Sequence, residues 1–122
     1  MKINMFIEIM LWLNVSLLFL HEMDAIFRKE WKMMIVLQNI EDEKAHIIFT
    51  AAHVFLYMMI LYLVVYQKDI IFWILQPFSI FHLFLHLGFR NHRSNNFKNL
   101  FSLAIIYAMA LIGIISIGAK LL

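Results

Sequence analysis

Histidines are the residues of this chain with the clearest capacity for chemistry. His82 and His86 are four residues apart, so on a helix they share one face and can bind the same metal ion. His21 opens the run HEMDA, which also contains the carboxylate of Asp24, and His53 stands in a long apolar stretch. Imidazoles combined with a carboxylate are typical ligands of zinc and iron. The residue types therefore predict a transition-metal site.

Other kinds of chemistry lack the residues they need. HEMDA has Ala25 where the HExxH motif of zinc proteases has its second histidine. The chain has no cysteine, only three glycines, and no serine in a nucleophile elbow. Its net charge of +2 is small and its basic residues are scattered along the chain, so we expect no nucleic-acid partner.

The composition predicts an integral membrane protein. Of the 122 residues, 64% are hydrophobic and only 15% are charged. A spanning helix needs about 20 mostly apolar residues. Four stretches meet this requirement, which predicts an all-α, four-helix membrane bundle forming one domain over 1–122, with spans at about 4–24, 45–66, 70–89 and 101–119.

Two features are expected between the first and second spans. The segment at about 27–38 is too short and too charged to cross the membrane, so we expect a short helix at its surface. Asn39, followed by IEDE, predicts an N-cap with an acidic first turn for the next helix.

Alternating direction through the four spans brings every histidine to one half of the bundle. The first and third spans end on that side, and the second and fourth begin there. We therefore predict a metal site from His21, Asp24, His53, His82 and His86. Nearby polar residues are predicted to support or surround it, namely Glu22, Glu30, Thr50, Tyr57, Arg90 and His92.

This pattern leaves several functions open. A metal bound here, zinc or iron, would suit a metal-dependent enzyme that acts on a lipid-like substrate within the bilayer. The alternatives are a non-catalytic scaffold or interaction protein with a structural histidine network, a haem b protein that uses His53 with His82 or His86, and a proton-conducting protein.

Two motifs carry a resemblance. HEMDA with the later KEW, and FHLFLHLGFRNH at residues 81–92, resemble a family of small bacterial multi-pass membrane proteins with a domain of unknown function. The resemblance covers nearly the whole chain. It implies the membrane fold and carries no known activity.

The distribution of lysine and arginine predicts the orientation. Three of these residues fall on the side that holds both termini, namely Lys2, Lys68 and Lys120. Seven fall on the opposite side: Arg28, Lys29, Lys32, Lys44, Arg90, Arg93 and Lys98. Because cytoplasmic loops carry the excess of positive charge, we expect a plasma (inner) membrane protein with both termini outside the cytoplasm.

Overall fold

The described residues form four long helices. The computed structural model describes residues 4–122, with α1 at Met5–Phe27, α2 at Asp42–Tyr66, α3 at Lys68–Gly88 and α4 at Leu100–Leu121. Each helix is long and apolar enough to cross a membrane, and the described residues contain no strand. The prediction of an all-α membrane bundle is confirmed.

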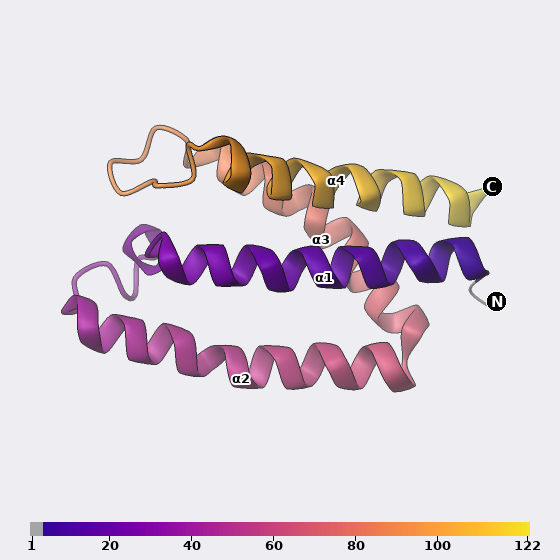
Figure 1. The fold of residues 1–122 in the computed structure, drawn as a ribbon, viewed down its shortest axis with the longest axis horizontal. Coiled ribbons are helices and arrows are strands. Elements are labelled where there is room, and N and C mark those ends of the chain that lie inside the picture. The colour runs from indigo at the N-terminus through magenta and orange to yellow at the C-terminus, as the bar shows by residue number, and fades with distance from the viewer. Residues whose placement is uncertain (1–3) are drawn as a thin grey trace.

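The helices place both long connections at one end of the molecule. Figure 1 shows that α1 begins and α4 ends at the opposite end, where the short turn from α2 to α3 also lies. The most extensive packing is between α4 and both α1 and α3, whereas α2 lies at the edge, against α1 and α3. In the same view α3 crosses the direction of α1 obliquely. The ends of α1 and α3 and the starts of α2 and α4 therefore share one end of the bundle.

The interior of the bundle contains polar side chains, while its surface is apolar. Asn14 of α1 donates hydrogen bonds to Gln76 Oε1 at 2.6 Å and to Ser79 Oγ at 3.0 Å, and all three side chains are buried. Large hydrophobic residues such as Phe55 and Phe84 are exposed, as expected where acyl chains replace water. The polar groups of the spans thus turn away from lipid.

A short helix follows α1, as predicted, but it covers only part of the predicted segment at 27–38. It is a 3-10 helix at Glu30–Met33, labelled η1, and turns occupy most of the remaining connection. Lys29 directly before it has a positive φ of 54°, which reverses the chain. Trp31 is only 2% exposed and packs against the ring of Phe49. The connection is thereby held against the bundle.

The predicted N-cap at Asn39 is wrong. Helix α2 begins at Asp42, with Glu41 at the N-cap position and no side-chain hydrogen bond there. The acidic first turn, Asp42 and Glu43, is present as expected. Asp42 also accepts ion pairs from Lys29 at 3.0 Å and Lys32 at 3.3 Å. These contacts tie the start of α2 to the connection that precedes it.

Candidate metal centre

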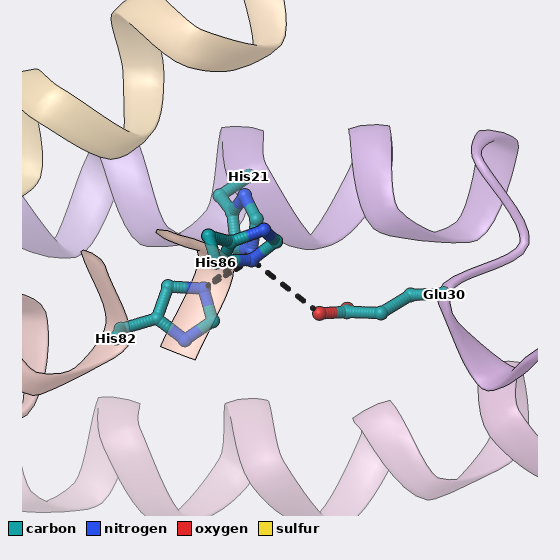
Figure 2. Close-up of side chains that lie close together, drawn as sticks. All are labelled: His21, Glu30, His82 and His86. Atoms are coloured by element: carbon teal, nitrogen blue, oxygen red, sulfur yellow. Dashed lines mark hydrogen bonds and ion pairs between the residues drawn. The ribbon is translucent and has the colours of Figure 1, made fainter. Parts of the chain in front are cut away.

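Three histidines from two helices meet at the end of the bundle that holds the long connections. His82 and His86 lie one turn apart on α3, and His21 faces them from α1 (Figure 2). The Nε2 atom of His82 lies 2.8 Å from Nε2 of His21 and 3.1 Å from Nε2 of His86. His21 is fully buried and His82 is 8% exposed. The three rings therefore turn the same nitrogen toward a common point.

Glu30 joins this group from outside the long helices. The chain reversal at Lys29 places Glu30 at the start of η1, and its Oε1 lies 3.6 Å from His86 Nε2. Figure 2 shows its carboxylate directed at the imidazoles. Burial raises the pKa of Glu30 from its ordinary 4.5 to about 7; the nearby Glu22 adds to the rise, while His53 opposes it. A cation beside Glu30 would stabilise its charged form.

The spacing of the four side chains is close to that of ligands on one ion. One ligand atom from each of His21, Glu30, His82 and His86 lies within 4.8 Å of the others. Ligand atoms bonded tetrahedrally to zinc at about 2.1 Å lie about 3.4 Å apart. Small side-chain rotations would accommodate this geometry. We refer to these four residues as the His3Glu group.

The arrangement of nitrogens is difficult to satisfy with hydrogen bonds alone. A neutral imidazole has one N–H and one lone pair, so Nε2 of His82 forms one good hydrogen bond, as donor or acceptor. Two other Nε2 atoms lie within 3.1 Å of it. Nδ1 of His21 is buried with no hydrogen-bond partner among residues 4–122. A cation at the common point would use all three lone pairs.

Phe97 covers one face of His86, and another side of the His3Glu group opens into a cavity. Phe97 is 2% exposed and packs edge-on against the ring of His86 at a centroid distance of 4.8 Å. On the other side lies a cavity of about 360 Å³, lined by Glu30, His82, His86, Met33, Met34, Ile35, Leu85 and Phe89. We call it the η1–α3 pocket. It gives a ligand with an apolar body access to three of the four side chains.

His53 lies apart from the group, and both of its ring nitrogens have partners. Nδ1 is 2.6 Å from the carbonyl oxygen of Phe49, to which it must donate, and Nε2 is 2.7 Å from Oε2 of Glu22. Since the carbonyl accepts only, a proton must also lie between Nε2 and Glu22. A metal ion or a haem iron would have to displace one of these contacts. We therefore leave His53 out of the ligand set.

Asp24 also has partners elsewhere. Its Oδ2 accepts a hydrogen bond from the hydroxyl of Ser102 on α4, and its Oδ1 lies 3.3 Å from Nε of Arg28. Asn99, the N-cap residue of α4, donates to the same Ser102 hydroxyl at 2.9 Å. Asp24 thus joins the end of α1 to the start of α4, one turn along α1 from His21.

The residues expected around the site have varied environments. Glu22 bonds to His53, as described, and the Tyr57 ring lies 5.6 Å from the His53 ring between centroids. Thr50 lies 3.4 Å from His46 Nδ1 on the exposed side of α2. His92 accepts a hydrogen bond from the Ser94 backbone, and Arg90 lines a second cavity. None of these five belongs to the His3Glu group.

Sequence reasoning underestimated Glu30 and overlooked Phe97. Glu30 was predicted only to support or surround the site, whereas the reversal at Lys29 brings its carboxylate to the imidazoles. The one signal for Glu30 in the sequence is that no other acidic residue lies between Asp24 and Glu41. Nothing in the sequence distinguished Phe97 from the other phenylalanines.

Comparison with known protein families gives one match. The model of a family of unknown function, DUF6713, matches residues 7–121. The chain belongs to this family. No curated protein and no solved structure matches it. Membership in DUF6713 agrees with the resemblance to an uncharacterised domain and assigns no activity, so the chemistry has to be argued from the His3Glu group.

Proposed function

We propose that this DUF6713 protein binds a transition-metal ion through His21, Glu30, His82 and His86. The observation that carries the proposal is the convergence of three Nε2 atoms beside a largely buried carboxylate. Such a cluster is unfavourable without a cation, because lone pairs face one another and the carboxylate is removed from water. Nearby, Arg28 neutralises Asp24 and His53 pairs with Glu22, which leaves Glu30 for the ion.

The donor set favours zinc or iron. Three imidazoles and one carboxylate, with no thiolate in the chain, suit divalent ions of intermediate softness. Hard ions such as calcium and magnesium prefer six or more oxygen ligands, or octahedral oxygen sites. Elemental analysis is needed to decide between zinc and iron.

The η1–α3 pocket supports a metal-dependent enzyme as the finer form of this proposal. A bound ion would supply Lewis-acid activation of water or of a substrate oxygen. Met33, Met34, Ile35 and Leu85 provide an apolar wall for a lipid-like substrate, while Phe97 packs against the ring of His86.

The decisive experiment measures metal in the purified protein. The protein, extracted in detergent, is expected to contain about one equivalent of zinc or iron by elemental analysis, as the donor count of a single site implies. The double variant H82A/H86A should lose it. His46→Ala is the matched control, because His46 is exposed, lies outside the His3Glu group and should leave the metal content unchanged.

Two results would overturn metal binding. One is wild-type protein that takes up neither zinc nor iron after incubation with each ion. The other is equal metal content in H82A/H86A and in the wild type. Thermal unfolding provides a second measurement of metal binding, since an ion present at about 100 times its dissociation constant adds about 2.7 kcal/mol to the free energy of unfolding.

A structural histidine network is the second candidate. It is favoured by the 2.8 Å contact between His21 and His82, which joins α1 to α3 without any ion. On this alternative, a chelator leaves the melting temperature unchanged while His82→Ala lowers it by a similar amount with and without chelator. On the metal proposal, the chelator lowers the wild-type melting temperature and the effect disappears in H82A/H86A.

A further inference from the structure

The basic side chains of this protein fall into two classes. Six of them have a carboxylate partner: Arg28, Lys29, Lys32, Lys44, Lys68 and Lys120. Within the part of the chain that the structure describes, no ion pair involves Arg90, Arg93 or Lys98. All three belong to the connection between α3 and α4, and the sequence has no acidic residue after Asp69. Among residues 4–122, positive charge is therefore uncompensated only in this connection.

Two of the uncompensated cations line one cavity. Arg90 follows the end of α3 and Lys98 precedes α4, and the two residues border the same cavity of about 290 Å³. Asn95 and the exposed Tyr107 add polar groups to its lining. We call it the α3–α4 pocket. Two cations around one hollow raise its positive potential, which attracts an anion.

Apart from His86, the remaining lining is apolar. It consists of Leu83, Leu87, Phe97, Leu103 and Ile106 from α3, the connection and α4. A free inorganic anion would leave this surface without a partner, whereas a lipid offers a charged headgroup and an acyl chain together. The pocket lies at the end of spanning helices, which is where lipid headgroups are found in a bilayer.

We propose that the α3–α4 pocket is a specific binding site for an anionic phospholipid. Arg90 and Lys98 contact the phosphate, since a guanidinium forms paired hydrogen bonds with phosphate oxygens and an ammonium adds a compact charge. Leu83, Leu87 and Leu103 pack against the first part of the acyl chain. His86 lines this pocket as well as the η1–α3 pocket, so the lipid is bound beside the His3Glu group. The proposal does not depend on a bound metal.

The competing explanation is ordinary membrane anchoring by positive charge. Substitution of Arg93 distinguishes this explanation from a specific lipid site. Arg93 lies in the same connection and is exposed and equally unpaired, but it does not line the α3–α4 pocket. A general electrostatic anchor depends on the number of charges and treats the three residues alike. At a specific site, the affinity for lipid depends on Arg90 and Lys98 and does not depend on Arg93.

The test compares lipid binding to the full-length protein and its variants. The probes are phosphatidylglycerol and phosphatidylcholine, titrated into detergent-solubilised protein and counted by native mass spectrometry. We expect saturable binding of phosphatidylglycerol in preference to phosphatidylcholine, weakened about tenfold or more by R90Q/K98Q, because charge-assisted hydrogen bonds are lost. Arg93→Gln should change the affinity less than about twofold, as a rim charge outside the pocket. Unchanged melting temperatures show that the variants are folded.

Three outcomes would overturn the proposal. These are equal affinity for the two lipids, equal weakening by R93Q and R90Q/K98Q, and tight binding of inorganic phosphate at the pocket with no preference for phosphatidylglycerol. Repeating the titration on the wild type with a chelator keeps the two proposals separate, because substitution of His86 would alter the lining of the α3–α4 pocket itself. Retained lipid binding with the chelator supports the lipid site whatever the metal content, and loss of lipid binding contradicts the independence proposed here.

Discussion

At the scale of residues, Glu30 is a carboxyl group whose pKa is raised by its surroundings. It is largely buried beside three imidazoles, and its pKa rises to about 7. A folded carboxyl group with a raised pKa retains a proton that the unfolded chain has released. Between pH 4.5 and about 7 the folded state binds the additional proton, so the contribution of Glu30 to stability falls as the pH rises through this window.

The contribution of Glu30 to the stability of metal-free protein should therefore be greater at pH 5 than at pH 8. The difference in pKa of Glu30 corresponds to about 3 kcal/mol. Glu30→Gln cannot titrate and should remove most of this difference. Thermal unfolding in detergent with a chelator, at both pH values, measures it. An identical pH dependence in the wild type and E30Q would contradict the role given to Glu30.

Added metal should reverse the effect of pH at Glu30, because the ion binds the deprotonated carboxylate. A bound cation stabilises the deprotonated carboxylate and neutral imidazoles, so metal affinity should rise with pH up to about 7 and then level off. Titration calorimetry with zinc at pH 5.5, 6.5 and 7.5 tests this expectation. An affinity that does not depend on pH would exclude Glu30 from the ligands.

At the scale of elements, the approach of α4 to α3 determines where the two α3 histidines lie. A Cβ placed on Gly113 would come within 2.7 Å of the backbone oxygen of Gln76 and 3.3 Å of the Ile80 side chain. The first of these neighbours is backbone and cannot rotate away. Glycine at this position therefore allows a close helix contact of the kind found between membrane helices.

Gly113→Ala should force α3 and α4 apart and lower stability by about 1–3 kcal/mol, the usual effect of overpacking. Gly118→Ala is the matched control on the same helix, because nothing lies within 4 Å of a Cβ there. It should be neutral or slightly stabilising, since alanine favours helix. Melting temperatures of the two variants provide the comparison. Equal stability of G113A and the wild type would show that the helices separate without loss.

At the scale of the whole molecule, both long connections share one end and carry most of the basic residues. The positive-inside tendency predicts that this end faces the cytoplasm. The absence of cysteine from the chain makes labelling of single introduced cysteines clean. Gln67 in the α2–α3 turn and Asn91 after α3 are both exposed and lie at opposite ends of the bundle.

In intact cells, a membrane-impermeant maleimide should label Gln67→Cys. Asn91→Cys should react only after the cells are permeabilised. The reverse pattern would invert the orientation and place the His3Glu group and the α3–α4 pocket on the outer side.

The sequence by itself determined the number of spans, the helical class and the gathering of all the histidines in one half of the bundle. These follow from segment length, composition and the alternation of direction, which need no knowledge of contacts. The tertiary structure decided which residues meet. Each helix is apolar nearly all round, so its rotation about its own axis depends on packing against its neighbours. That rotation joins His21 to His82 and His86 and turns His53 toward Glu22. The backbone reversal at Lys29 returns Glu30 to the group, because a single left-handed residue redirects the chain in a way that composition does not reveal.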